Sequence, residues 1–222
     1  MIKAVIFDMY ETLITHFDSP LYFGTQMALD AGIEEEKFQK TWRAEEENRT
    51  IGKITLEKLL EKILKENNCF SEEKMKYIVD KRICCKEEAF EHLHIEIIPM
   101  LKALKEKGML IGLISNCFSE EAMVIKKSVL YPFFDAVCLS YDEGIQKPNA
   151  AIFERCIEKL DVKAEECLYV GDGGSNELEV AKELGMKAVQ AVWYLKEGSN
   201  QPTQRIADFE HIETPLDIID II

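Results

Sequence analysis

Short, fully apolar runs divide most of this chain into segments. The first run, Ala4–Phe7, is apolar at every position and stops at Asp8. A run this short, with neither alternation nor a helical period, predicts a strand buried on both faces of a sheet. Similar runs predict further strands at residues 109–114, 136–139, 167–170 and 188–193.

Amphipathic stretches lie between these strands in the second half of the chain. Residues 149–160, for example, place Ile152, Phe153 and Cys156 on one helical face. Further helices are expected at residues 99–107, 119–130 and 175–184, and a short strand or helix near residues 218–222, in a polar tail that follows Gly198. Alternating strands and helices predict an α/β fold with a doubly wound, Rossmann-like parallel sheet.

The segment between the first two strands has a different pattern, because it is rich in Glu and Lys and reads as successive helices. Its clearest helix follows Thr55, a plausible N-cap, and repeats Leu or Ile at helical spacing up to Leu64. Other helices are expected at residues 21–31 and 35–48 and after Ser71. None of these helices can bury its apolar face alone. We therefore predict a helical domain, residues 15–92, inserted into an α/β core formed by residues 1–14 and 93–222.

Composition and charge limit the function classes. The 222 residues are 47% hydrophobic and carry a net charge of −14, which argues against a nucleic-acid-binding face. No apolar run approaches the length of a membrane span, and the chain enters a core strand at once, so no membrane contact and no signal peptide are expected. Seven irregularly spaced cysteines favour free thiols in a reducing compartment, and hence a cytoplasmic protein.

Polar residues follow each predicted strand at its carboxyl end. Parallel strands end at one edge of a sheet, where open α/β sheets bind ligands. The residues in question are Asp8 and Thr12, then Ser115 and Asn116, then Lys147, and finally Asp172 and Glu177. Carboxylates can hold a divalent cation, while hydroxyls and an ammonium bind the oxygens of a dianion. One Asp left free to attack would be a covalent nucleophile.

In order and spacing, these groups resemble the motifs of the haloacid dehalogenase-like hydrolase superfamily, with a helical cap inserted between the first and second motifs. The resemblance implies that Asp8 is the nucleophile and that Thr12 orients it. Ser115, followed by Asn116, would bind the transferred group, and Lys147 would neutralise charge between nucleophile and substrate.

The same resemblance implies a cofactor, Mg²⁺. Its ligands would be Asp8, the backbone carbonyl of Tyr10 and Asp172, and Glu177 would hold a magnesium-bound water. Without a cation, Asp8 and Asp172 would repel each other. The fourth motif, in which Asn176 and Glu177 follow Asp172 at the usual distance, is the magnesium-binding pattern.

Two positions depart from the pattern of the family's phosphatases. Tyr10 stands where they carry a second Asp, and a Tyr there resembles the metal-independent 2-haloacid dehalogenase branch. Arg43, beside Trp42, resembles a carboxylate-binding Arg of that branch, but a core Trp beside a solvated Arg is the favoured explanation, because such pairs usually pack and snorkel. Glu11 replaces the usual Gly, and it either strains the turn or points outward.

The magnesium pattern favours phosphoryl transfer over dehalogenation. We therefore predict a magnesium-dependent phosphatase acting on a small phosphorylated metabolite. The alternatives are a 2-haloacid dehalogenase and a non-catalytic relative that binds a phosphorylated ligand or a partner protein. The sequence does not indicate the oligomeric state.

Tyr10 also bears on the leaving group, because a phenol with a reference pKa of about 10 is a poor general base at neutral pH. Acyl phosphates, phosphoanhydrides or aryl phosphates, whose leaving groups need no proton, would then be preferred. Close to the nucleophile loop, His16, Phe17, Tyr22 and Phe23 either line the substrate pocket or seal the hinge between cap and core.

Overall fold

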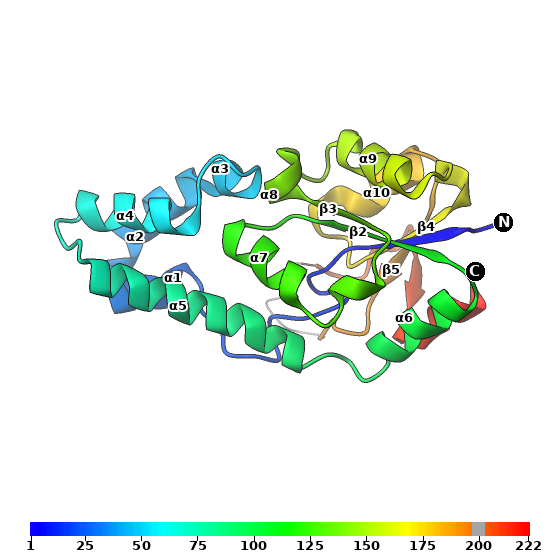
Figure 1. The fold of residues 1–222 in the computed structure, drawn as a ribbon, viewed down its shortest axis with the longest axis horizontal. Coiled ribbons are helices and arrows are strands. Elements are labelled where there is room, and N and C mark those ends of the chain that lie inside the picture. The colour runs from blue at the N-terminus through cyan, green and yellow to red at the C-terminus, as the bar shows by residue number, and fades with distance from the viewer. Residues whose placement is uncertain (197–202) are drawn as a thin grey trace.

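A six-stranded parallel sheet forms the centre of the protein in a computed structural model, which describes residues 1–196 and 203–222 (Figure 1). The strand order is β3-β2-β1-β4-β5-β6. The strands are β1 (Ala4–Phe7), β2 (Leu110–Ser115), β3 (Ala136–Leu139), β4 (Cys167–Gly171), β5 (Lys187–Ala191) and β6 (Glu210–Ile212). The predicted start of the polar tail at Gly198 lies outside the described residues.

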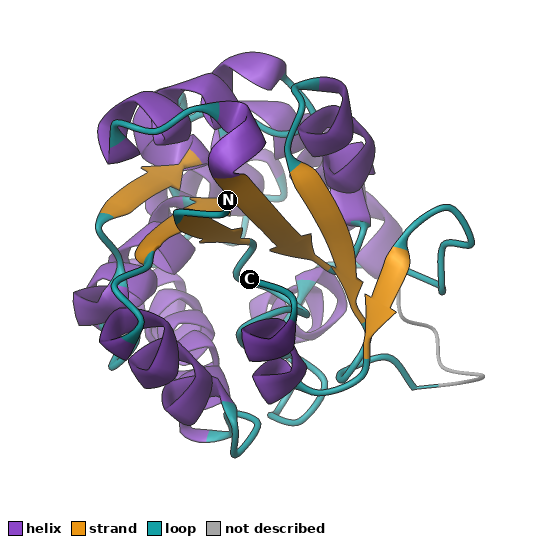
Figure 2. Cartoon of the chain, turned by 90° about the vertical axis from the view of Figure 1, so that its right-hand side faces the viewer, coloured by secondary structure: helices purple, strands orange, loops and turns teal. Residues whose placement is uncertain are grey.

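Helices cover both faces of the sheet, as Figure 2 shows. They are α6 (Ile97–Glu106), α7 (Ser119–Lys127), α8 (Ser140–Glu143), α9 (Ala150–Leu160) and α10 (Glu177–Glu183). Successive residues of β1 point to opposite faces: Val5 and Phe7 pack with α6 and α7, whereas Ala4 and Ile6 pack with α9 and α10. Both faces are therefore buried, which is why the strand sequences are apolar throughout. The predicted doubly wound α/β class is confirmed.

The segment between β1 and α6 is helical, as expected, and has a hydrophobic cluster of its own. Its helices are α1 (Gly24–Ala31), α2 (Glu35–Ala44), α3 (Glu46–Thr50), α4 (Leu56–Glu66) and α5 (Glu72–Glu88). The side chains of Thr55 and Ser71 cap α4 and α5 by accepting hydrogen bonds from Lys58 N and Lys74 N. We call residues 15–92 the cap; these exact domain boundaries remain a prediction.

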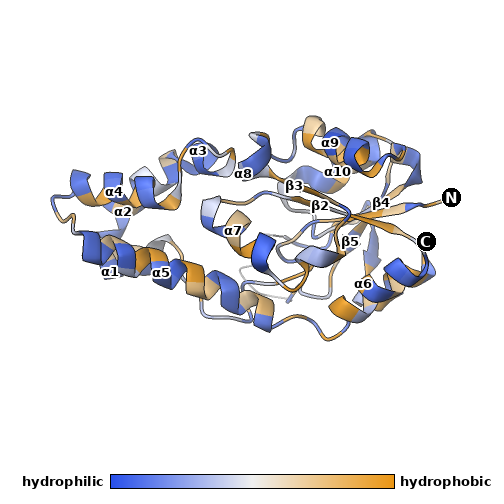
Figure 3. Ribbon diagram, viewed as in Figure 1, coloured by the Kyte–Doolittle hydropathy of each residue, from blue (hydrophilic) through white to orange (hydrophobic). Residues whose placement is uncertain are grey.

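Polarity follows this arrangement. In Figure 3 the strands β2 and β4 are largely hydrophobic in colour, whereas helices such as α9 carry a hydrophilic face. Among the residues that the structure describes, no helix combines the length and the apolar character that crossing a bilayer requires.

The structure differs from the sequence prediction in a few elements. The helix expected over residues 35–48 is broken at Glu45, where α2 gives way to α3. Strand β6 has only three residues and a polar composition, so the hydrophobic pattern gave no sign of it. The tail then forms a 3₁₀ helix, Pro215–Asp220.

Candidate active site

The carboxyl ends of the central strands bring the first and fourth motifs together. Phe7 is paired with Leu113 of β2 and with Val170 of β4. Asp8 therefore leaves β1 level with the ends of both neighbours, and its backbone N–H donates to the Val170 carbonyl at 3.0 Å. Ser115 is the last residue of β2, and Asp172 directly follows β4. This is the sheet edge that the strand alternation predicted.

Lys147 bridges the acidic groups at this edge. Its ammonium nitrogen lies 2.6 Å from Oδ1 of Asp8, and it also donates a short hydrogen bond to Oε2 of Glu177. Burial alone would lower the pKa of Lys147, but the charges of Asp8 and Glu177 raise the pKa above its usual value. The side chain is thus a fixed positive charge beside the proposed nucleophile.

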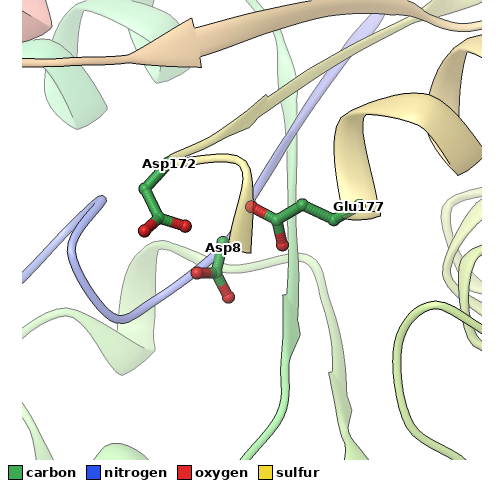
Figure 4. Close-up of side chains that lie close together, drawn as sticks. All are labelled: Asp8, Asp172 and Glu177. Atoms are coloured by element: carbon green, nitrogen blue, oxygen red, sulfur yellow. The ribbon is translucent and has the colours of Figure 1, made fainter. Parts of the chain in front are cut away.

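Three buried carboxylates converge at the same place. Figure 4 shows Asp8, Asp172 and Glu177 directed toward one another, and each offers an oxygen within 4.8 Å of the others. Burial raises the pKa of Asp8 and, with the nearby Asp8 and Asp172 charges, raises the pKa of Glu177 to about 8, despite the opposing effect of Lys147. One ammonium does not balance Asp8 and Asp172, even when Glu177 carries a proton. A divalent cation would compensate the remaining negative charge, and hard carboxylate oxygens are ligands that Mg²⁺ accepts.

The Asp172 and Glu177 carboxylates differ in their hydrogen-bond partners. Oδ1 of Asp172 accepts from Gly174 N at 2.9 Å, and Oδ2 accepts from the Thr203 hydroxyl. Both oxygens of Glu177 face protein donors, because Oε2 accepts from Lys147 and from the Tyr169 hydroxyl at 2.9 Å, and Oε1 accepts from Gly173 N at 3.3 Å. Glu177 thus fits the predicted place behind the metal ligands better than a place among them.

Asn116 holds the loop that carries Lys147. The Lys147 backbone N–H donates to Oδ1 of Asn116 at 2.8 Å, and Nδ2 of Asn116 donates to the Lys147 carbonyl at 3.0 Å. This paired contact ties the end of β2 to the Lys147 loop. It makes Asn116 a positioning residue, whereas the neighbouring Ser115 is fully buried at the end of β2.

Two buried hydroxyls near Asp8 have no hydrogen-bond partner among the described residues: those of Thr12 and Tyr10. The Thr12 backbone is fixed, because Trp193 donates to its carbonyl at 2.8 Å. The Tyr10 ring stacks on His16 with 4.5 Å between centroids. Burial raises the pKa of the Tyr10 phenol well above its usual value, so Tyr10 is an even poorer base than its residue type suggested.

The structure shows which of the two alternatives for Glu11, a strained turn or an outward-pointing side chain, is correct. Its φ of 57° is left-handed, so the residue is strained where the family usually has Gly. The side chain does not point outward: Oε2 accepts from the Thr15 hydroxyl at 2.6 Å and Oε1 accepts from His16 N at 3.0 Å. The carboxylate therefore shapes the loop that leads from the nucleophile to the cap.

A cavity of about 290 Å³ opens onto the carboxylates. His16, Phe17 and Phe23 line it together with Asp8 and Tyr10. Tyr22 is turned away, since its hydroxyl donates to Asp30 at 2.6 Å. Of the four residues that could line the pocket or seal the hinge, three line this cavity.

Arg43 lies apart from the carboxylates. It is exposed on α2 and borders a larger cleft of about 680 Å³ between cap and core, which also reaches Asn116 and Lys147. Trp42 is buried in the hydrophobic cluster of the cap. The cation stacked on Trp42 is Arg49, 3.7 Å from the ring centroid. The simpler interpretation of the Trp42–Arg43 pair, a core Trp beside a solvated Arg, therefore fits the structure.

His16 makes stability depend on pH. Burial, followed by the charge of Lys86, lowers the pKa of His16 from 6.5 to about 3. Below pH 6.5 His16 becomes protonated in the unfolded chain, whereas in the folded protein it stays neutral down to about pH 3. The free energy of unfolding should therefore decrease progressively as pH falls through that window. We expect His16→Phe, which keeps a ring against Tyr10, to flatten the decline in unfolding free energy measured with urea between pH 7 and pH 4.

The exposed His92 provides the control for this prediction. The decline in stability should persist in His92→Phe. Equal slopes in wild type and His16→Phe would contradict the assignment.

Sequence reasoning missed two residues that support the site from within strands. Tyr169 in β4 hydrogen-bonds Glu177, and Gln190 in β5 donates from Nε2 to the Asp172 carbonyl at 2.8 Å. Each is a polar side chain within a strand that is otherwise largely apolar. Such an interruption was the available signal, since a fully buried polar group needs a partner.

Fold and site together define a class of protein. The family model for haloacid dehalogenase-like hydrolases matches residues 2–185, most of the chain. The chain therefore belongs to the haloacid dehalogenase-like hydrolases, as the order of its motifs implied.

The chain is also similar to particular members of this family. The chain is 25% identical, over its whole length and 97% of the relative, to a glyceraldehyde 3-phosphate phosphatase of Methanopyrus kandleri. It is 29% identical to pyrophosphatase PpaX of Bacillus mycoides over 53% of this chain and 58% of the relative. A crystal structure of a 2-haloacid dehalogenase from Pseudomonas syringae matches 100% of this chain and 98% of that chain, with a TM-score of 0.70 and 22% identity; this likeness shows the shared fold alone.

Proposed function

We propose that this hydrolase is a magnesium-dependent phosphatase that acts on a small phosphorylated metabolite through Asp8. The observation that carries the proposal is the buried cluster of Asp8, Asp172 and Glu177 around a single Lys147. Its uncompensated negative charge suits a divalent cation, and relatives matched by sequence are named as phosphatases.

The residues divide the reaction between them. A carboxylate oxygen of Asp8 attacks phosphorus, the bond from phosphorus to the leaving oxygen breaks, and an aspartyl-phosphate forms. Lys147 and the free hydroxyl of Thr12 bind the phosphoryl oxygens as negative charge develops on them. The Ser115 hydroxyl binds the same phosphoryl group. Water then attacks phosphorus, which releases phosphate and restores the carboxylate.

Magnesium would be held by Asp8, Asp172 and the Tyr10 carbonyl, and when bound it neutralises the phosphoryl group and makes phosphorus more electrophilic. Glu177 keeps Lys147 in place from behind, through the short contact to its ammonium. The cap encloses the cavity and limits access to water and to macromolecules, which favours a small substrate.

The second candidate is a 2-haloacid dehalogenase, and Tyr10 is the observation that favours it. In that reaction Asp8 would form an ester to carbon and expel halide, without a metal. The carboxylate cluster weighs against it, because a metal-free mechanism gives no reason to bury Asp172 within 4.8 Å of the nucleophile.

A substrate panel tests the proposal. Phosphate release from phosphate esters, acyl phosphates and pyrophosphate is measured with magnesium and with a chelator, and halide release from 2-chloropropionate is measured with the chelator. We expect magnesium-dependent phosphate release and no halide release. Chelator-resistant halide release would establish the dehalogenase, and no turnover in either assay would favour a non-catalytic binding protein.

Tyr10 predicts the leaving-group preference within that panel. With its phenol buried and its pKa raised, no carboxyl at this position can protonate an alkoxide, and such proton transfer contributes on the order of 10²- to 10⁴-fold. Acetyl phosphate should therefore be turned over with a higher kcat/KM than glucose 6-phosphate. We expect Tyr10→Asp to narrow this difference and Tyr10→Phe to leave it unchanged. Loss of alkyl-phosphate turnover in Tyr10→Phe would mean that the phenol transfers the proton after all.

A further inference from the structure

Arg49 is an unusual residue at the contact between cap and core. It lies in α3 of the cap, and only 3% of its surface is exposed. Its guanidinium carbon is 3.7 Å from the ring centroid of Trp42 and 4.0 Å from that of Phe118, the residue that precedes α7 of the core. The two rings hold the planar group in place, so its donors are fixed in direction.

Most of those donors are unused. Nη2 makes a long hydrogen bond, 3.4 Å, to the Trp42 carbonyl. Nε and Nη1, which carry three N–H groups between them, are buried and have no partner among the described residues. Burial lowers the pKa of Arg49 to about 10, so the side chain remains charged at neutral pH. A buried, unpaired charge is strongly destabilising, and its retention points to a ligand.

Glu120 and Glu121 do not pair with Arg49, because they pair with other cations. Arg82 donates to Glu120 at 3.1 Å and to Glu121 at 3.2 Å, and Lys86 lies 2.7 Å from Glu121. This pairs two cations with two carboxylates across the boundary between cap and core. Arg49 forms no ion pair among the described residues, although the charge of Glu46, which lines the same cavity, also acts on its pKa.

Arg49 borders a cavity of about 310 Å³. His16 and Phe23 line this cavity and also line the one that opens onto Asp8. These side chains therefore form a wall that the two cavities share. A small molecule whose phosphoryl group lies at Asp8 would extend across this wall toward the guanidinium.

We propose that Arg49 binds a second anionic group of the substrate, a carboxylate or a second phosphoryl group, at the end opposite the transferred phosphoryl. Its planar donors match the paired oxygens of either group. The substrate class is then a small molecule with an anion at each end. This inference rests on the proposed phosphatase function, which places the phosphoryl group at Asp8.

Binding to the Asp8→Asn protein tests the inference without requiring turnover. The ligands are 2-phosphoglycolate, ethylene glycol bisphosphate and 2-hydroxyethyl phosphate, which share a two-carbon backbone, together with their three- and four-carbon homologues, measured by calorimetry with magnesium. We expect at least one doubly anionic ligand to bind more tightly than its hydroxyl counterpart. Arg49→Met should weaken that ligand on the order of 10- to 100-fold and leave the hydroxyl ligand nearly unchanged, as expected for a lost hydrogen bond to a charged group. The carboxylate and bisphosphate series show which anion is preferred.

Lys53→Met is the matched control, because it removes one exposed positive charge from the same cap and should preserve the preference for the doubly anionic ligand.

Without ligand, Arg49→Met should be at least as stable to heat as its parent, the Asp8→Asn protein, since it removes an uncompensated charge. A lower unfolding temperature would mean that Arg49 stabilises the fold instead of binding a ligand. The inference would be overturned if Arg49→Met weakened the doubly anionic and the hydroxyl ligands equally. It would also be overturned if the Asp8→Asn protein bound no doubly anionic ligand more tightly than its hydroxyl counterpart, whatever the length of the carbon backbone. A preference that disappears in Arg49→Met, in a protein found to lack phosphatase activity, would leave the anion site standing and refute only the proposed reaction.

Discussion

Replacing Asp8 with Asn is expected to abolish turnover, with a loss on the order of 10⁴-fold or more, as when a covalent nucleophile is removed from other enzymes. The amide keeps the shape of the side chain but cannot form the acyl phosphate. Lys147 stays in place, because its second contact, to Glu177, is untouched. The measurement is phosphate release with the best substrate of the panel.

The fold of this variant should persist, which makes the result interpretable. Asp8→Asn removes one of three clustered carboxylates, and burial together with the Asp172 charge raises the pKa of that carboxyl against the effect of Lys147. Its thermal unfolding without metal should therefore stay close to that of wild type. Near wild-type turnover in a folded Asp8→Asn protein would contradict the nucleophile assignment.

Removing magnesium should have the second largest effect. Chelation should abolish phosphate release, and added Mg²⁺ should restore it. Mg²⁺ at 100 times its dissociation constant should also add about 2.7 kcal/mol to the unfolding free energy. Full activity in the presence of the chelator would contradict a metal-dependent reaction.

Proton release offers a sharper check on the metal site. In the metal-free protein the pKa of Glu177 is raised to about 8, so at pH 7 its carboxyl mostly retains a proton. A cation beside it favours the charged form, and binding should expel that proton. Calorimetric titration with Mg²⁺ in two buffers of different ionisation enthalpy measures the release. Glu177→Gln should remove it, whereas the exposed, helical Glu154→Gln should not.

Much of the fold could be predicted because the sheet is buried on both faces. Strand β1 has no solvent-facing side chain, so its four residues are all apolar and the run stops where the chain reaches the site. Parallel pairing then brings the ends of β1, β2 and β4 to one edge. That is why the sequence alone predicts that residues as far apart as Asp8 and Asp172 lie together.

Other features depend on three-dimensional contacts that no local pattern records. Arg49 looks like an ordinary solvated residue of a charged helix, and only its contacts with the Trp42 and Phe118 rings show that it is buried. The inward turn of Glu11 depends on partners four and five residues along the loop. Strand β6 owes its place to pairing with β5 and not to hydrophobicity.

The most direct test of the central claim is to trap the covalent intermediate. Wild-type protein is mixed with magnesium and acetyl phosphate, quenched in acid within one turnover, digested and analysed by mass spectrometry. The account predicts one added phosphoryl group on the side chain of Asp8, its loss on treatment with hydroxylamine, and no adduct in Asp8→Asn. Phosphate release at full rate with the adduct on another residue would contradict the account. So would the absence of any adduct at every quench time, if Asp8→Asn also turns over substrate.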